Sequence, residues 1–84
     1  MTVIFTRSFI KQYRKAPAKI QRKFDKQLDL LVNNPRYPSV GVKKMVNKDN
    51  VWEGRVDIHW RFTFEKHSKE LVLRSLGTHD IYRK

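Results

Sequence analysis

The segment of residues 51–75 constrains the fold most, because it is β-prone along its length and far longer than an ordinary strand. It must therefore fold back on itself. A three-residue turn at residues 57–59 predicts an antiparallel pair with one aromatic and apolar face, as a core face should be. The pairs expected on that face are Val56 with Trp60, Gly54 with Phe62, and Trp52 with Phe64.

The other face of this segment is predicted to be polar. It is expected to pair Arg55 with Arg61 and Glu53 with Thr63. A second turn at residues 66–69 predicts a third strand whose apolar residues continue the core face. The pairs expected from this turn are Phe64 with Leu71, Phe62 with Leu73, and Arg74 beside Arg61.

Three arginines, Arg55, Arg61 and Arg74, are thus expected in a row across the open face of the sheet. Like charges directly opposite one another are destabilising, so such a row suggests an anion held between them. Arginine suits phosphate because its planar guanidinium donates in pairs and keeps its charge. Alternatively, the side chains extend into water or pair with nearby carboxylates, namely Glu53, Glu65 and Glu70.

The length of 84 residues indicates one small domain, residues 1–84, with a modest core. The sequence has no cysteine, which excludes a disulfide framework, a thiol nucleophile and a thiolate metal site. It also has no apolar run of membrane-spanning length and no recognisable signal peptide. We therefore expect a soluble, cytoplasmic protein with no membrane partner.

The charge is the strongest feature of the composition. Nineteen Lys and Arg residues against eight Asp and Glu residues give a net charge of +11. This excess favours a polyanionic partner: nucleic acid, an anionic membrane surface or an acidic protein. Charge alone does not choose among these three.

The first half of the chain predicts a strand followed by two helices. Residues 2–6 are β-prone, and the spacing of apolar residues in 7–15 indicates a short helix that Thr6 or Ser8 would cap. Pro17 suits the first turn of a second helix, which ends at Asn33-Asn34-Pro35. The apolar stripe of this second helix consists of Ile20, Phe24, Leu28 and Leu31.

An extended connector at residues 35–39, a weak strand at 40–46 and a turn at 47–50 lead into the long β segment. The fold class is therefore predicted to be α+β with the order βααββββ. A helical hairpin would pack on one face of a small, mostly antiparallel sheet and leave the arginine face open to solvent. An open basic sheet face is a plausible platform for single-stranded nucleic acid.

The chain resembles the RelE/ParE superfamily of toxins from type II toxin–antitoxin systems. The residues that carry the resemblance are Trp52-Glu53-Gly54-Arg55-Val56, Trp60-Arg61-Phe62, the closing Leu76-Gly77-Thr78-His79-Asp80, and the connector Asn34-Pro35-Arg36-Tyr37-Pro38-Ser39 leading into Lys43-Lys44-Met45. The resemblance implies an endoribonuclease that cleaves mRNA, in many members within the ribosomal A site, without metal or other cofactor. The ribose 2′-hydroxyl attacks the adjacent phosphate and leaves a 2′,3′-cyclic phosphate.

The resemblance also implies roles for individual residues. Arg61 and Arg55 would hold the phosphate, and His79 would act as general acid. The general base is left open between Glu53, whose alternative is a salt bridge to Arg55, and His59, whose alternative is a solvated turn residue. The residues assigned to RNA or phosphate contact are Arg74, Lys43, Lys44, His59 and Tyr82, with Tyr82 stacking on a base.

The partners implied are a cognate antitoxin, mRNA and the ribosome. An acidic antitoxin segment that folds on binding would associate quickly with so basic a toxin. Two alternatives share the fold or the charge: a ParE-like inhibitor of DNA gyrase, and a basic RNA- or ribosome-binding module without catalysis. The set Arg55, Arg61 and His79 favours the ribonuclease, because gyrase inhibitors generally do not keep it complete.

Overall fold

The computed structural model describes residues 2–33, 42–45 and 50–78 of the chain. Within these residues the elements follow the order expected from the sequence. The elements are β1 (Thr2–Phe5), α1 (Arg7–Lys15), α2 (Ala18–Asn33), β2 (Lys43–Lys44), β3 (Val51–Arg55), β4 (Trp60–Lys66) and β5 (Glu70–Thr78). Neither described helix is both long and apolar enough to cross a membrane.

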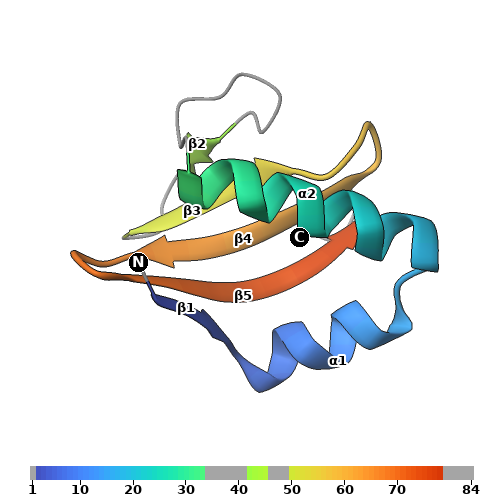
Figure 1. Ribbon diagram of the computed structural model, residues 1–84, viewed down its shortest axis with the longest axis horizontal. Helices are drawn as coiled ribbons and strands as arrows, with labels where there is room; N and C mark the ends of the chain where they lie inside the picture. The colour runs from blue at the N-terminus through green and yellow to red at the C-terminus, as the bar shows by residue number, and fades with distance from the viewer. Residues whose placement is uncertain (1, 34–41, 46–49, 79–84) are drawn as a thin grey trace.

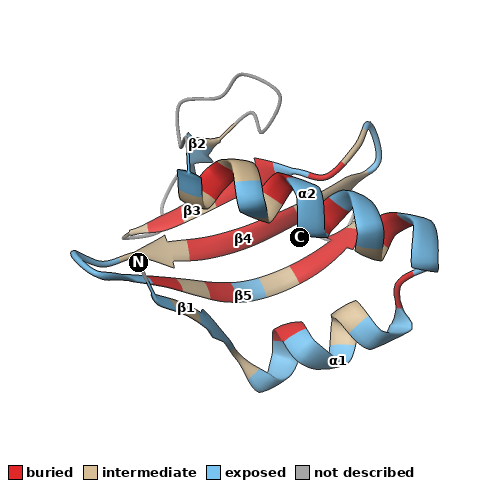
Figure 2. Ribbon diagram, viewed as in Figure 1, coloured by how far each residue is buried: buried red, intermediate tan, exposed pale blue. Residues whose placement is uncertain are grey.

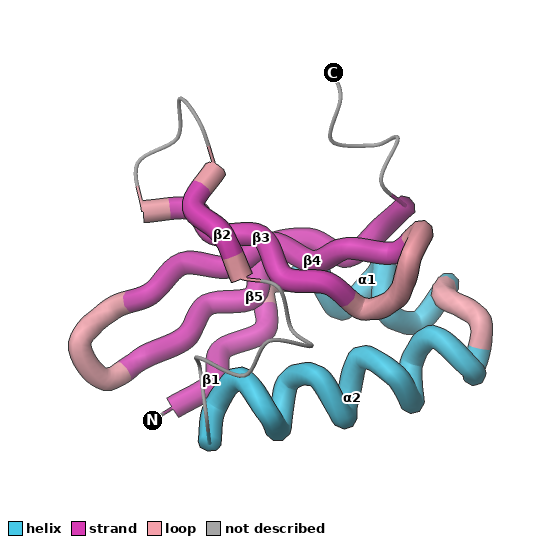
Figure 3. Tube along the Cα trace, turned by 90° about the horizontal axis from the view of Figure 1, so that it is seen from above, coloured by secondary structure: helices cyan, strands magenta, loops and turns pink. Residues whose placement is uncertain are grey.

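The described strands form one mixed sheet in the order β1-β5-β4-β3-β2. Strand β1 runs parallel to β5, and the other neighbouring strands are antiparallel. Both helices lie on one side of this sheet (Figures 1 and 3). The predicted α+β class and the two-layer arrangement are therefore confirmed.

The helix boundaries have local causes. Thr6 caps α1, since its hydroxyl accepts a hydrogen bond from the N–H of Phe9 at 3.2 Å and donates one to the Leu73 carbonyl at 2.8 Å. Pro17 lies one residue before α2 rather than in its first turn, and its carbonyl accepts the first helical bonds from Ile20 and Gln21. The cap thus ties the start of α1 directly to β5.

The core lies between the helices and the sheet and is rich in phenylalanine. Figure 2 shows buried residues, in red, in both layers. Phe9 of α1 and Phe24 of α2 have ring centroids 5.1 Å apart, and Phe24 meets Phe62 of β4 edge-on at the same distance. Phe62 and Phe64 are fully buried. A β-carbon at Gly54 would lie 2.3 Å from the Phe62 ring, so only glycine fits opposite Phe62 without rearrangement.

The register predicted between β3 and β4 is confirmed. Trp52 lies opposite Phe64, Gly54 opposite Phe62, and Arg55 opposite Arg61. Val56 donates its N–H to the Trp60 carbonyl at 2.9 Å, which closes the turn where the sequence predicted it. The aromatic face of this hairpin therefore packs on the helices, as expected.

The register predicted between β4 and β5 is wrong. Phe64 lies opposite Leu73 rather than Leu71, and Phe62 lies opposite Leu76 rather than Leu73. The turn is tighter than expected, because the backbones of His67 and Glu70 bond to each other.

The pairing of β4 with β5 also shifts by one residue between Thr63 and Phe64, so that Arg74 is an extra, unpaired residue in β5. Gly77 lies opposite Arg61. The expected position of Arg74 beside Arg61 is therefore wrong.

Within the predicted weak strand at residues 40–46, the described residues 42–45 contain β2, Lys43–Lys44, which pairs with β3. The predicted connector at 35–39, most of the turn at 47–50, and the candidate site residues His79 and Tyr82 lie outside the described residues.

Candidate functional site

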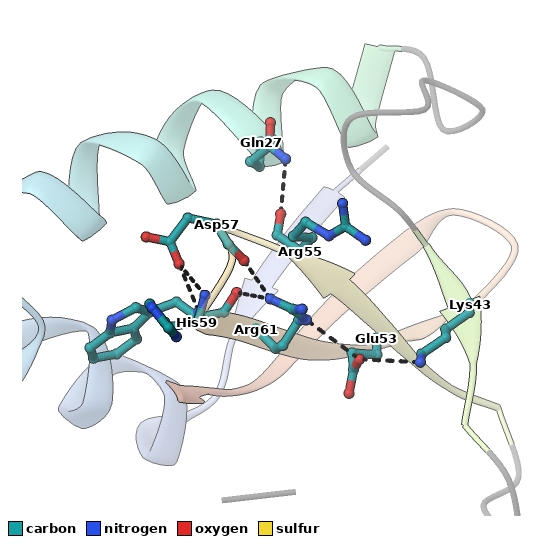
Figure 4. Close-up of polar contacts among 8 residues, drawn as sticks. Gln27, Lys43, Glu53, Arg55, Asp57, His59 and Arg61 are labelled. Carbon is teal, nitrogen blue, oxygen red and sulfur yellow. Dashed lines mark hydrogen bonds and ion pairs between the residues drawn. The ribbon is translucent and has the colours of Figure 1, made fainter. Parts of the chain in front are cut away.

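Charged side chains of three neighbouring strands meet on the sheet face that points away from the helices. Arg55 and Arg61 are opposite each other, and Glu53 lies next to them, opposite Thr63 of β4 and Lys43 of β2. Figure 4 shows Lys43, Glu53 and Arg61 in line across the strands. The sequence thus correctly predicted that Arg55, Arg61 and Glu53 occupy neighbouring positions in the sheet.

Glu53 is a buried carboxylate between two cations. Its residue is 7% exposed, and its Oε1 atom lies 3.9 Å from both the Lys43 Nζ and the Arg61 Nε atoms. A carboxylate in so dry a place needs such compensation. The salt bridge expected between Glu53 and Arg55 is therefore replaced by ion pairs with Lys43 and Arg61.

Arg61 is held in place by the turn between β3 and β4. Its side chain is only 16% exposed. Its Nη1 atom donates to the backbone carbonyl of Asp57 in a short contact and to the carbonyl of Trp60 at 3.1 Å. The guanidinium is therefore oriented by two carbonyls on one side and by Glu53 on another.

Arg55 has a different environment, although it lies directly opposite Arg61. The residue is exposed, and its guanidinium points away from Glu53 (Figure 4). Its backbone carbonyl accepts a hydrogen bond from the side chain of Gln27 on α2 at 2.9 Å. The pair thus combines one accessible guanidinium with one that the fold fixes.

Asp57 organises the turn itself. Its Oδ1 atom accepts hydrogen bonds from the N–H groups of His59 and Trp60, both at 2.8 Å, and its Oδ2 atom lies 3.9 Å from Lys23 Nζ. Burial acts to raise the pKa of Asp57, but the two N–H groups and the positive charges of Lys23 and His59 outweigh it and lower the pKa. This carboxyl therefore stays ionised at neutral pH.

His59 is an exposed residue of this turn, beside Arg61 in sequence. Lys43 and Lys44 are both exposed, but they lie opposite Glu53 and Trp52, respectively, and so face opposite sides of the sheet. Lys43 therefore belongs to the cluster and Lys44 does not.

Arg74 is separate from the cluster. Its Nη1 atom lies 3.4 Å from a Glu65 oxygen, and both side chains are well exposed. The tighter turn shifts the pairing of β4 with β5 by two residues, and the bulge shifts it by one more beside Arg61. The predicted row of three arginines is therefore wrong, because Arg74 does not lie beside Arg61.

The arginine face of the sheet, which was expected to be open to solvent, is open only in part. Glu53 and Thr63 on this face are buried, at 7% and 5% exposure. The cause at Glu53 is the pair of cationic side chains beside it, and the Thr63 hydroxyl is engaged with that of Ser75 in a short hydrogen bond. The most accessible parts of the cluster are Arg55, Lys43 and the turn, and Arg61 and Glu53 keep small exposed fractions of 16% and 9% of their side chains.

Sequence reasoning missed Asp57 and Gln27 as members of the site. Asp57 had a detectable signal, because aspartate in a tight turn commonly accepts hydrogen bonds from backbone N–H groups two residues onward. The signal for Gln27 was weaker. Its position beside the apolar stripe of α2, where it is buried, was the one indication of its role.

Among the described residues, no group of three or more potential metal ligands comes together.

The fold of this chain is shared by proteins of known structure. No protein-family model matches the sequence, and a search among curated proteins gives no match. Solved structures do match over nearly the whole chain, and they have the fold of RelE/ParE superfamily toxins.

Three of these structures illustrate the likeness. YafQ from E. coli strain BL21(DE3) has a TM-score of 0.79 and 18% identity, covering 94% of this chain and 93% of its own. A chain of the RelB–RelE antitoxin–toxin complex from Methanococcus jannaschii has a TM-score of 0.78 and 17% identity, covering 95% of each chain. A YoeB/ParE toxin from Agrobacterium tumefaciens has a TM-score of 0.76 and 16% identity, covering 94% and 99%. At these identities the likeness establishes the fold.

Proposed function

We propose that this protein is the toxin of a type II toxin–antitoxin system and a metal-independent endoribonuclease that cleaves mRNA on the ribosome. Two observations support the proposal. The fold is shared with YafQ and with a chain of an antitoxin–toxin complex. The polar face of the sheet carries two arginines opposite each other, with a carboxylate 3.9 Å from one of them. The single observation that carries the proposal is this cluster of Arg55, Arg61 and Glu53.

The chemistry requires the RNA 2′-hydroxyl to attack the adjacent phosphorus while the bond to the 5′-oxygen breaks. The products are a 2′,3′-cyclic phosphate and a free 5′-hydroxyl. One group must take the proton of the 2′-hydroxyl, another must protonate the leaving oxygen, and cations must stabilise the extra charge on the phosphorane. These demands match the types of side chain in and beside the cluster.

Arg55 and Arg61 stabilise the phosphate in this proposal, and they do so differently. The exposed Arg55 meets the RNA backbone first, while the fixed Arg61 supplies a preorganised charge for the transition state. Lys43 and the turn residue His59 add contacts to the backbone. Lys44 and Tyr82 remain predicted RNA contacts, and Arg74 is no longer among them.

Glu53 is our preferred general base, since an ionised carboxylate is an acceptor and this one lies beside Arg61. His59 is the alternative base, because it occupies the turn next to the same arginine. His79 is the proposed general acid; it follows β5, which ends at Thr78 opposite Trp60, one residue from Arg61.

An acidic antitoxin, mRNA and the ribosome are the proposed partners, in the cytoplasm. The net charge of +11 supports rapid association with any of them. A chain with this fold in the RelB–RelE complex is associated with an antitoxin, which supports the first partner.

The test is induced expression followed by mapping of RNA 5′ ends. The wild-type protein is expected to arrest translation and to produce new 5′ ends within codons. Arg61→Ala and His79→Ala are expected to abolish both effects while the purified proteins keep their circular-dichroism spectra. Retained RNA affinity without any cleavage by the wild type would favour a non-catalytic binding module.

Inhibition of DNA gyrase is the second candidate, because one similar structure is named as a YoeB/ParE toxin. A supercoiling assay with purified gyrase separates the two functions. The ribonuclease proposal predicts normal supercoiling at protein concentrations that arrest translation. Inhibited supercoiling with intact mRNA would favour the gyrase inhibitor.

A further inference from the structure

The turn between β3 and β4 is held by Asp57 in two ways. The carboxylate accepts the N–H groups of His59 and Trp60, each at 2.8 Å, and so fixes the backbone that follows it. The backbone carbonyl of the same residue accepts a hydrogen bond from Arg61. One residue therefore both shapes the turn and contacts the arginine.

The second carbonyl that holds Arg61 belongs to Trp60, at 3.1 Å from Nη1. The N–H of Trp60 is one of the two groups bound by the Asp57 carboxylate. Asp57 therefore contacts Arg61 through its own carbonyl, and its carboxylate fixes the N–H groups that follow that carbonyl in the turn (Figure 4). The Trp60 carbonyl is also held by the N–H of Val56 at 2.9 Å, so loss of the carboxylate would free chiefly the Asp57 carbonyl, and with it one of the two backbone contacts of Arg61.

Helix α2 supports this turn from the other side of the sheet. Lys23 lies 3.9 Å from the Asp57 carboxylate, and one helical turn later Gln27 donates to the Arg55 carbonyl at 2.9 Å. Gln27 is buried, whereas the Lys23 side chain is 44% exposed. The Gln27 bond is therefore the stronger anchor, and the Lys23 ion pair contributes little.

We propose that Asp57 is a positioning residue that sets the orientation of the Arg61 guanidinium through the β3–β4 turn. The proposal rests on the proposed function only in assigning Arg61 to the scissile phosphate. Asp57 itself touches no reacting atom. Its contribution is to hold Arg61 in one place before RNA arrives, so that no reorientation is needed at the transition state.

The first test measures Arg61 directly by NMR, in the full chain and without RNA. The Nη–H signals of Arg61 are expected to exchange slowly with water in the wild type, because Nη1 donates to the carbonyls of Asp57 and Trp60 and local opening of the turn is required to release it. Asp57→Ala should accelerate this exchange about tenfold or more, whereas Asp57→Asn, which keeps an acceptor oxygen at the same place, should stay near the wild-type rate.

Asn50→Ala is the matched control. Asn50 lies at the opposite end of the β3–β4 hairpin, where its side chain donates to the Lys66 carbonyl at 2.8 Å. Its loss should lower stability without changing the Arg61 signal. An Arg61 signal that is the same in Asp57→Ala as in the wild type, or that changes equally in Asn50→Ala, would overturn the proposal.

The second test measures single-turnover cleavage of mRNA on programmed ribosomes. Asp57→Ala is expected to lower the rate at saturation by about tenfold to a hundredfold with little change in apparent affinity, since misplaced groups lose transition-state contacts first. Asp57→Asn should restore most of the rate. A changed Arg61 signal with no cleavage by the wild type would reject the ribonuclease but keep the positioning role.

If Asp57→Ala does not fold, the pH dependence of the Arg61 signal in the wild type replaces it. Protonation of Asp57 at low pH removes the charge from its acceptor oxygen, so the protection of the Arg61 signal, taken relative to the intrinsic exchange rate at each pH, should fall by a small step as the pH falls through the pKa of Asp57. The other charged groups facing this carboxylate are Lys23 and His59. A step of equal size in Asp57→Asn would contradict the proposal.

Discussion

The hairpins β3–β4 and β4–β5 share strand β4 but keep their strands aligned by different means. In β3–β4 the turn is closed by a side chain, Asp57, and the strands are locked by Gly54 under the Phe62 ring. In β4–β5 the turn is closed by the backbones of His67 and Glu70, and the strand contains a bulge at Arg74. Side chains therefore set both the turn and the strand register of the β3–β4 hairpin. This hairpin carries the charged cluster.

The difference suggests why the arginines of the two hairpins have different environments. Arg61 lies next to the side-chain-closed turn and is mostly buried, whereas Arg74 lies at the bulge and forms an exposed ion pair with Glu65. Preorganisation of a charge needs a rigid frame, and only the β3–β4 hairpin supplies one. The following predictions test this contrast, from the largest expected effect to the smallest.

The largest effect is expected from removing the fixed arginine. Arg61→Ala should lower the rate of mRNA cleavage by about 10² to 10³-fold, as loss of one preorganised charge donor typically does. Arg74→Ala, which removes an arginine from the other hairpin, should leave the rate unchanged within error. Quantified 5′-end formation on programmed ribosomes measures both variants. Equal losses would mean that the two hairpins contribute alike.

The next effect is on stability. Gly54→Ala should destabilise the fold by about 1–3 kcal/mol, because the new β-carbon would lie 2.3 Å from the Phe62 ring. Chemical denaturation measures this loss. In the Gly54→Ala/Phe62→Leu double variant the smaller side chain removes the overlap, so the combined loss should be less than the sum of the two single losses. Strict additivity would show that the ring can move aside freely.

Deletion of Arg74 is expected to have a smaller effect. Leu73 and Ser75 already pair with Phe64 and Thr63, so the deletion turns the bulge into a regular ladder without moving any side chain to the other face. The lost ion pair to Glu65 is exposed, so stability should change by less than about 1 kcal/mol. Amide hydrogen exchange would reveal the register. A flipped or slipped β5 would contradict this prediction.

The smallest effect is expected in the pH dependence of stability. The pKa of Asp57 is lower in the folded protein than in the unfolded chain, so its ionised form stabilises the fold. This contribution is complete above the unfolded pKa, about 4, and is lost as the pH falls through the folded pKa. Asp57→Asn should therefore show a shallower loss of stability between about pH 5 and 2 than the wild type. Parallel curves would argue against this shift.

The sequence was sufficient to predict the β3–β4 hairpin because apolar and polar residues alternate strictly along its two strands. Trp52, Gly54, Phe62 and Phe64 allow only one register that buries every aromatic ring. The helices were predictable for the same reason, since Ile20, Phe24 and Leu31 follow one helical face and are buried.

The bulge was not predicted, although the sequence contains its signal. The spacing of buried leucines in β5 changes from two, between Leu71 and Leu73, to three, between Leu73 and Leu76. A strand that keeps both leucines on the core face must contain one extra residue. Reading β5 as a regular strand, together with the looser turn expected at residues 66–69, put Arg74 beside Arg61.

Sequence patterns could not predict which individual side chains form ion pairs with one another. Glu53 pairs with Lys43 because β2 is the neighbour of β3, and it pairs with Arg61 because the turn orients that guanidinium. Both contacts depend on three-dimensional placement of flexible side chains. The catalytic roles of Glu53, His59 and His79, and the stacking role of Tyr82, stay predictions.

The parallel pairing of β1 with β5 has a consequence for folding during synthesis. Among the described strands, β1 pairs with β5 alone, and the two lie far apart in the sequence. Residues 70–73 must therefore be synthesised before residues 2–5 find their partner and the helices gain a complete sheet to pack on. A chain halted before residue 70 lacks β5 and should not reach this fold.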